Sequence, residues 1–262
     1  MPTLARIVGT RLRTAAVRCI SPLLLLALWW LAAERGWVRE LFLPSPASVV
    51  HTFFTLLEEG EILEPLWISL LRTAGGGLLA LAAALPLGLW MARSTAVGRL
   101  LDTPVTVGLV IPKITFLPAF ILWLGIGSIS KIALVGVTCV FPLIVAVYHG
   151  ARATPTVFLW SGAAMGVRGA AALYRVVLPC ILPSVYAGVR VAVPVALITT
   201  YTAEMVAGGG GLGAALMYAQ RMFETPKVFV YILLMLLSGM LLDGILGLLR
   251  RWFLPWMEQG QR

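Results

Sequence analysis

Long apolar stretches, separated by short polar ones, dominate the order of residues along this chain. Each of five stretches is close to the ~17–25 residues that an α-helix needs to cross a bilayer. A sixth, shorter stretch follows the basic start of the chain. We therefore predict an all-α integral membrane protein with six transmembrane helices, at about 19–33, 66–90, 104–124, 132–148, 183–207 and 228–249.

Residues 1–18 carry four arginines and no acid, and an apolar stretch follows at once. A basic start before an apolar core is also typical of a secretory signal peptide. No small-x-small cleavage site follows, however, and the remaining chain is itself rich in apolar stretches. We predict a basic cytoplasmic segment at 1–18 and one membrane-embedded domain at 19–262.

The segment 150–183 lies between two apolar stretches and has the pattern of two short helices. Thr154 can cap the first helix, and Pro155 then takes its first position, where a missing N–H costs nothing. Gly166 is placed to end this helix, because glycine adopts the left-handed conformation common at helix C-termini. The helix would lie on the protein's own surface or in a groove of a partner.

A second helix fits residues 169–177, whose apolar side chains share one stripe. Pro179 is expected to end this helix, because proline lacks the N–H that a helix interior requires. Pro183 is then expected to open the next transmembrane helix. The sequence thus predicts a two-helix loop with a glycine elbow between two membrane spans.

Composition supports the membrane assignment. Hydrophobic residues make up 60% of the chain, charged residues only 12%, and the mean hydropathy is +0.95. A soluble domain has ~25% charged residues. The formal charge of +9 would indicate nucleic-acid binding in a soluble chain, but in a membrane protein its distribution between loops decides its meaning. The three cysteines lie far apart, so neither a disulfide framework nor a zinc pair is indicated.

Lysine and arginine are unevenly distributed between the loops. With the N-terminus in the cytoplasm, twelve of the 20 basic residues face the cytoplasm, five face outward and three lie within predicted helices. Basic residues concentrate in the cytoplasmic loops of membrane proteins, so we predict that both termini are cytoplasmic. The 150–183 loop is then cytoplasmic as well.

The sequence contains no complete motif for catalysis or cofactor binding. None of the three lysines belongs to a Gly-Lys-Ser/Thr phosphate loop. The GGGGLG at 208–213 matches a dinucleotide fingerprint only formally, because it follows a predicted transmembrane helix rather than a strand, and we interpret it as a flexible outer turn. His51 and His149 have no paired ligands at helical spacing. We predict neither an enzyme nor a metal site.

Charged residues within the predicted helices carry the remaining polar chemistry. Lys113 lies near the middle of the 104–124 helix, where an isolated lysine costs ~2.5–3.5 kcal/mol on insertion scales. Glu204, toward the outer end of its own helix, is one candidate partner. For Arg190 and Asp243 we favour pairing with one another or with backbone. For Lys113 and Glu204 such pairing and a place on a translocation path both stay open.

The 150–183 loop resembles the cytoplasmic loop of the membrane subunits of bacterial ATP-binding-cassette (ABC) importers, which reads Glu-Ala-Ala-x3-Gly-x9-Ile-x-Leu-Pro. Four residues keep that spacing: Gly166, Val176, Leu178 and Pro179. Three depart from it, where the family has its acid and two alanines: Trp160, Ser161 and Gly162. The missing carboxylate matters, because in the family it is part of how the loop engages the ATPase.

Further stretches extend the likeness over roughly residues 40–256, among them IPKITFLPAFILWLGIGSISK and AEMVAGGGGLG. They resemble the permease branch that includes nitrate, sulfonate, taurine and thiamine-precursor importers. The resemblance implies the type I importer permease fold in a bacterial plasma (inner) membrane. It also implies a homodimer of permeases, a dimer of cytoplasmic ABC ATPase subunits that hold ATP and Mg, and an extracytoplasmic substrate-binding protein. It implies no cofactor in this chain and no nucleic acid as a partner.

Polar and aromatic residues within the predicted helices are the candidates for the translocation path: Lys113, Phe116, Tyr201 and Glu204. An aromatic such as Phe116 is, however, more often part of a core than of a substrate site. The resemblance places the ATPase-coupling surface at Trp160, Ser161, Gly162, Gly166, Arg168, Tyr174, Val176, Leu178 and Pro179.

Two other functions stay open: an ion-driven secondary transporter, and a membrane scaffold that transports nothing. Inverted repeats with broken helices would favour the secondary transporter, and we find none in the sequence. The sequence does not name the substrate, whether nitrate, a sulfonate, taurine or a pyrimidine or flavin-type vitamin. Lys113 points to an anion, although close members of the branch carry uncharged heterocycles.

Overall fold

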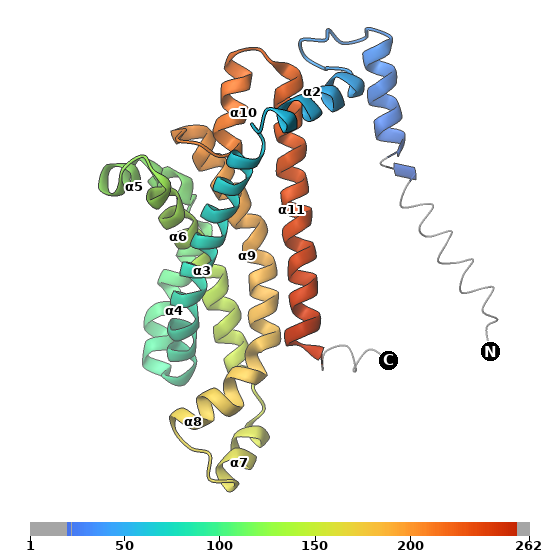
Figure 1. Ribbon diagram of the computed structural model, residues 1–262. Helices are drawn as coiled ribbons and strands as arrows, with labels where there is room; N and C mark the ends of the chain where they lie inside the picture. Colours follow the sequence, from blue (N-terminus) through green and yellow to red (C-terminus); the bar gives the residue numbers. More distant parts are fainter. Residues whose placement is uncertain (1–19, 22, 256–262) are drawn as a thin grey trace, which may run out of the picture. The chain divides into compact units, whose positions relative to one another are not determined.

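The computed structural model describes residues 20–21 and 23–255, and every regular element in this part of the chain is helical (Figure 1). This confirms the predicted all-α fold. The predicted basic segment 1–18 lies outside the described residues. The chain divides into two compact units, residues 1–61 with 216–232, and residues 62–215 with 233–262.

The smaller unit joins an early helix to the start of the last one. It contains an apolar helix at Leu23–Glu34, the helix α2 (Pro46–Glu58) and the first turns of α11 (Thr225–Phe253). The indole of Trp29 stacks on Phe229 with ring centroids 5.7 Å apart. This contact fastens the early helix to α11, which continues into the larger unit.

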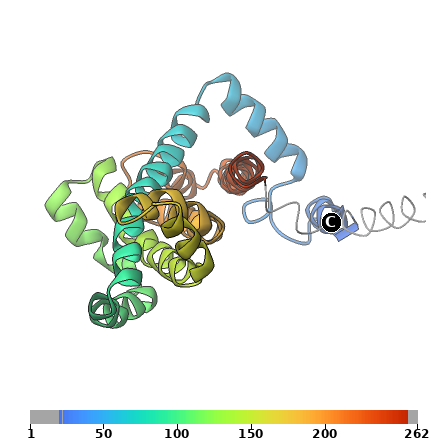
Figure 2. The ribbon, with the colours of Figure 1, turned by 90° about the horizontal axis from the view of Figure 1, so that it is seen from below.

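The larger unit is built on α3 (Leu63–Arg93), α6 (Ser128–Arg152) and α9 (Leu178–Ala207), which lie side by side in Figures 1 and 2. Glycine and alanine are frequent among the buried residues of α3 and α9, so the helices can pack closely. A cluster of buried apolar residues lies between them: Ala80, Ala84, Val135, Cys139, Leu143, Ala192 and Ala196.

Glycines set the spacing between these helices. A Cβ atom added to Gly76 of α3 would lie 2.5 Å from Cβ of Val135 on α6. A Cβ atom added to Gly188 of α9 would lie 2.5 Å from Cβ of Ala146 on α6. No side chain fits at such distances, so the glycines let α6 pack directly against the backbones of both neighbours.

The predicted continuous helix at 104–124 is wrong. Two helices bent by 91° take its place. They comprise α4 (Thr95–Val110), then η1 (Lys113–Phe116) continued by α5 (Leu117–Leu124). In Figure 2, α4 is seen end-on while α5 runs across the view. Pro112 explains the break, because the residue before a proline is driven out of the helical region, and Ile111 is extended with ψ 131°.

The predicted helix end at Pro179 and helix start at Pro183 are also wrong. A helical run of 38 residues extends without interruption over Ala170–Ala207. It comprises α8 (Ala170–Ala172), a π-helical turn η2 (Leu173–Val177) and α9. The wider π turn lies just before Pro179, where an ordinary α-helix would set the proline ring against the carbonyl four residues back. The chain therefore passes both prolines without leaving the helix.

Four helices in the described residues are long and apolar enough to cross a membrane, or five if the bent pair is one span. They are Leu63–Arg93, Ser128–Arg152, Ala170–Ala207 and Thr225–Trp252. The predicted first span, 19–33, begins outside the described residues, and its described part is the shorter apolar helix Leu23–Glu34. The count of six transmembrane helices is therefore not confirmed.

Candidate functional site

The loop between α6 and α9 begins with α7 (Thr156–Ala164), at the foot of Figure 1. The predicted cap at Thr154 is wrong, because Pro155 holds the N-cap position. The hydroxyl of Thr154 instead donates back to the carbonyl of Gly150, 3.4 Å away. The side chain thus closes the end of α6 rather than opening α7.

The end of α7 is a Schellman motif, and it confirms the predicted role of Gly166. This glycine has φ +81°, the left-handed conformation. Its N–H donates to Ala163 O at 3.1 Å, and the N–H of Val167 donates to Gly162 O at 2.8 Å. These two bonds satisfy carbonyls that would otherwise be left free at the helix end. Gly169 also has a positive φ, so the elbow turns at two glycines.

The nine residues predicted to couple to an ATPase divide into an inner and an outer group. Gly162 is buried against Val176, and Leu178 is half-buried. The remaining members are exposed: Trp160, Ser161, Gly166, Arg168, Tyr174 and Pro179. The inner group thus holds the elbow together, and the outer group faces away from the chain.

The outer side of this loop is strongly apolar. Trp160 is 70% exposed, Met165 77% and Tyr174 67%, and Val157 and Phe158 are exposed beside them. Single exposed apolar residues are ordinary, but a group of large ones on one loop marks an interaction site. A hollow of about 490 Å³ adjoins them, lined by residues from the end of α6, the linker to α7 and the starts of α7 and α9, including Phe158 and Pro179.

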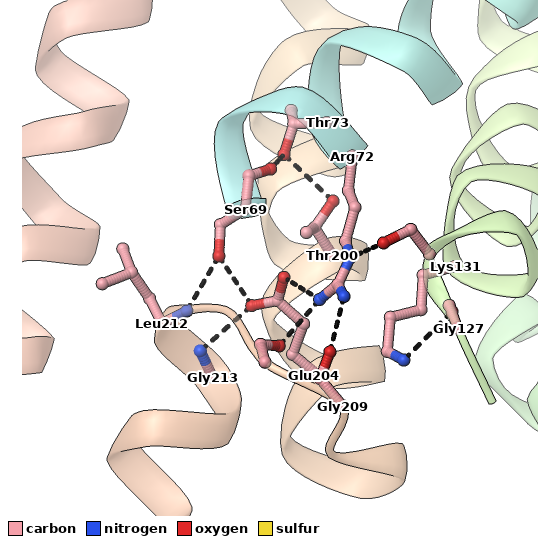
Figure 3. Close-up of polar contacts among 12 residues, drawn as sticks. Ser69, Arg72, Thr73, Gly127, Lys131, Thr200, Glu204, Gly209, Leu212 and Gly213 are labelled. Atoms are coloured by element: carbon pink, nitrogen blue, oxygen red, sulfur yellow. Dashed lines mark hydrogen bonds and ion pairs between the residues drawn. The ribbon is translucent and has the colours of Figure 1, made fainter. Parts of the chain in front are cut away.

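A buried ion pair joins α3 to α9 in the same unit (Figure 3). The guanidinium of Arg72 and the carboxylate of Glu204 lie 2.8 Å apart, and their side chains are 3% and 0% exposed. Ser69 donates to the second carboxylate oxygen at 2.8 Å, and Nε of Arg72 donates to Ser128 at 3.1 Å. A buried charge is tolerated only when it is paired and its hydrogen bonds are completed, as they are here.

The glycine run after α9 completes this cluster and is no loose turn. All four glycines at 208–211 have positive φ. The carbonyls of Gly209 and Gly210 accept from the Arg72 guanidinium, both at 2.7 Å. The N–H of Gly213, at the start of α10 (Leu212–Arg221), donates to Glu204 at 3.0 Å. The predicted flexibility of this turn is therefore wrong, because its backbone is hydrogen-bonded to the ion pair.

A second buried cation lies next to the pair. Lys131 is 0% exposed, although its sequence position suggested a loop. Its ammonium donates to Ile126 O at 2.7 Å and to Gly127 O at 3.3 Å. A Cβ atom added to Gly209 would lie 3.3 Å from this nitrogen. Two cations thus fix two carbonyl-rich turns in place, and we call Arg72, Lys131, Glu204 and the 208–211 turn the buried network.

Three of the four residues predicted on a translocation path have other polar partners, and the fourth, Phe116, is exposed. Lys113 donates to Leu109 O at 3.1 Å and lies 5.4 Å from the ring centre of Phe141. Glu204 pairs with Arg72, so its proposed pairing with Lys113 is wrong. The hydroxyl of Tyr201 is hydrogen-bonded to Ser238 on α11, and Phe116 is exposed.

The favoured pairing of Arg190 with Asp243 is confirmed. Nε of Arg190 on α9 lies 3.4 Å from Oδ1 of Asp243 on α11. The buried network, in contrast, escaped the sequence analysis. Its signal was present: Arg72 and Glu204 are charges within apolar stretches, and Glu204 stands four residues before the glycine run.

Comparison with known proteins gives a consistent result. The family model of the binding-protein-dependent transport system inner membrane component matches residues 84–254. A protein of Escherichia coli (strain K12) named as the aliphatic sulfonates transport permease protein SsuC is 35% identical, over 90% of this chain and 89% of its own length. The taurine transport system permease protein TauC of the same organism is 30% identical, over 90% of this chain and 88% of its own length.

A solved structure shares the fold. It is described as an inward-facing conformation of the MetNI methionine ABC transporter. The match has a TM-score of 0.65 at 19% identity and covers 72% of this chain and 94% of that chain. The helical bundle described above is therefore an arrangement already known from an importer.

Proposed function

The chain belongs to the family of binding-protein-dependent transport system inner membrane components, the permease subunits of ABC importers, and we propose that its ATPase subunit docks on the 150–183 loop. The observation that carries the proposal is the exposed apolar group on α7 and its elbow, led by Trp160. The chain is a multi-pass membrane protein, and a separate subunit hydrolyses ATP.

The contact proposed for this loop differs in chemistry from a salt bridge. Position 160 is an indole where the family motif has a carboxylate, and it is 70% exposed. An exposed indole gains free energy by burying area on a partner, and its ring face also attracts a cation. Arg168 lies on the same elbow and is exposed, so it supplies charge at the edge of the docking surface.

We propose the finer arrangement on the same basis. The uneven arginine distribution supports cytoplasmic termini, with the 1–18 segment and the 150–183 loop on the ATPase side. A second copy of the chain completes the path, and an extracytoplasmic binding protein delivers the solute. Lys113 and Phe116 keep exposed surface and are assigned to the path, whereas the wholly buried Glu204 is assigned to the network. Relatives named for aliphatic sulfonates and taurine favour a small organic sulfonate as the solute.

The test is Trp160→Ala in the permease co-expressed with its cognate ATPase subunit. We expect roughly tenfold weaker association of the ATPase, measured by co-purification and titration in detergent, with little dependence on salt because the contact is apolar. The matched control is Trp123→Ala, which removes a similarly exposed indole from α5. Equal loss in both variants, or retention of full affinity in Trp160→Ala, would overturn docking at this loop.

A further inference from the structure

Two ion pairs of this protein have opposite character. Arg72 and Glu204 are buried, 2.8 Å apart and surrounded by further hydrogen bonds. Arg190 and Asp243 are 57% and 63% exposed, and their closest atoms are 3.4 Å apart. Among the described residues, neither side chain of this second pair makes another polar contact. An ion pair that is this exposed and has so few hydrogen bonds contributes little to stability. Its presence is therefore better explained by a role in function.

The exposed pair lies within two apolar helices and not at their ends. Arg190 lies twelve residues after Leu178 and seventeen before Ala207, so it is ~18 Å and ~26 Å from the two ends of α9. Asp243 lies well inside the apolar helix Thr225–Trp252. Charges at such depth face the interior of a bundle or a water-filled cavity. The face of α9 and α11 that carries them is therefore either wet or covered by protein.

An apolar groove of about 450 Å³ lies between α3, α9 and α11. Val189 and Leu242, which line it, directly precede Arg190 and Asp243 in the chain. Its lining is apolar except for Thr73 and Tyr186. A largely apolar hollow with few polar groups at its side is the usual form of a small-ligand site, since those few groups decide which ligand binds.

We propose that Arg190 and Asp243 form a transient binding site for a small zwitterion on the translocation path, a solute with an anionic and an ammonium end. The inference rests on the proposed function. A zwitterion can take the place of both partners at once, with its anionic end on the guanidinium and its ammonium on the carboxylate. A simple anion would meet Asp243 as a like charge and leave it unpaired, so the pair selects against it.

The first test measures whether water reaches the position of Arg190. A cysteine replaces Arg190 in a background lacking the three native cysteines, within the complete permease–ATPase complex in proteoliposomes. We expect a membrane-impermeant thiol reagent to modify it in at least one nucleotide state. The matched control is Ile198→Cys, two turns further along α9 and likewise exposed within this chain. An unreactive Arg190→Cys in every state would assign this face to the second copy and overturn the proposal.

The second test asks which solute binds. Taurine serves as the zwitterion, ethanesulfonate as an anion of similar size, and ethylammonium as the cation. Val193→Cys, in the groove lining, keeps both charges and reports protection from the reagent. We expect taurine to slow modification at least fivefold, the two single-charge probes to slow it less than twofold, and Asp243→Asn to abolish the effect of taurine. Equal protection by ethanesulfonate, or protection by none of the three, contradicts the proposal.

The two proposals fail in different ways. ATP hydrolysis and co-purification of the ATPase are measured on the same preparations. If they are normal while taurine gives no protection, only the zwitterion site is wrong. If Trp160→Ala and Trp123→Ala bind the ATPase equally well, only the docking proposal is wrong, independently of the accessibility of Arg190→Cys.

Discussion

The two ends of the α3–α6–α9 bundle differ in character: one buries charged side chains, and the other exposes apolar ones. At the network end, three buried charges have hydrogen-bond partners within the chain, including the carbonyls of two turns. At the loop end, large apolar side chains such as Trp160 and Met165 are exposed. The polar groups of the first end are satisfied within the chain, whereas the apolar side chains of the second end are the surface on which we propose that the ATPase docks. The comparison shows that one bundle can combine a rigid, hydrogen-bonded end with a second end that offers a docking surface.

A substitution of Arg72 is the most direct test of the network end. Arg72→Met leaves Glu204 buried and uncompensated, so we expect the free energy of unfolding to fall by ~3–5 kcal/mol. Denaturant unfolding in detergent, followed by circular dichroism, measures it. The double variant Arg72→Met/Glu204→Leu should be more stable than the single one, because the buried carboxylate that lost its ion-pair partner is removed as well. Arg99→Met, at an exposed arginine, serves as control, and an equal effect there would deny the network its special role.

The glycine turn tests whether backbone conformation or close packing holds the network. A Cβ atom added to Gly211, at φ +96°, would lie 2.2 Å from Oε1 of Glu204. Gly208 has φ +64° and open space around it. We expect Gly211→Ala to cost ~3 kcal/mol, from strain and displacement of the carboxylate, and Gly208→Ala ~1 kcal/mol from strain alone. Equal costs measured by thermal unfolding would mean that the close approach is unimportant.

At the loop end, Gly166 tests whether the conformation of the elbow matters for coupling. Gly166→Val forces a β-branched residue into φ +81°, at a local cost of ~1–2 kcal/mol. We expect ATP hydrolysis to become uncoupled from solute uptake in proteoliposomes while the protein stays assembled. Gly166→Asn is the matched control, because asparagine tolerates the left-handed conformation and should retain coupling. Normal uptake by Gly166→Val would show that the elbow geometry is dispensable.

Lys113 gives the smallest expected change in stability. Its ammonium contacts the backbone of Leu109 and the ring of Phe141, with no acid beside it in the described residues. Lys113→Met should therefore shift the free energy of unfolding by less than ~0.5 kcal/mol while slowing uptake of the solute. Lys131→Met, at a buried lysine, should destabilise the protein clearly. If both variants unfold alike and transport alike, Lys113 has no part in the path.

The sequence predicted what local patterns determine. Hydrophobic length located the helices α3, α6 and α11, and the glycine at 166 marked the end of α7. The helix breaks were predicted less well, because a proline has two outcomes. Pro112 breaks its helix, whereas Pro179 is passed through a π turn that depends on packing rather than on propensity.

The buried network was beyond sequence reasoning for a physical reason. Arg72 and Glu204 are 132 residues apart, and only the tertiary fold brings them together. Lys113 seemed the natural partner for Glu204 because both interrupt apolar stretches. The bend at Pro112 instead places Lys113 at a helix break, and Arg72 from α3 occupies the position beside the carboxylate.

The unbroken helical run Ala170–Ala207 has a mechanical consequence. At ~1.5 Å per residue its 38 residues form an arm ~57 Å long, which begins at the elbow and ends three residues beyond Glu204. The π turn at Leu173–Val177 and the prolines Pro183 and Pro194 inside α9 are the places where this arm can bend, because each interrupts the regular helical hydrogen bonds. Beyond its far end, the carbonyls of the glycine turn accept hydrogen bonds from Arg72. A displacement at α8 is therefore passed along one continuous helix toward the buried network, and the π turn and the two prolines are the places where that displacement can be reduced.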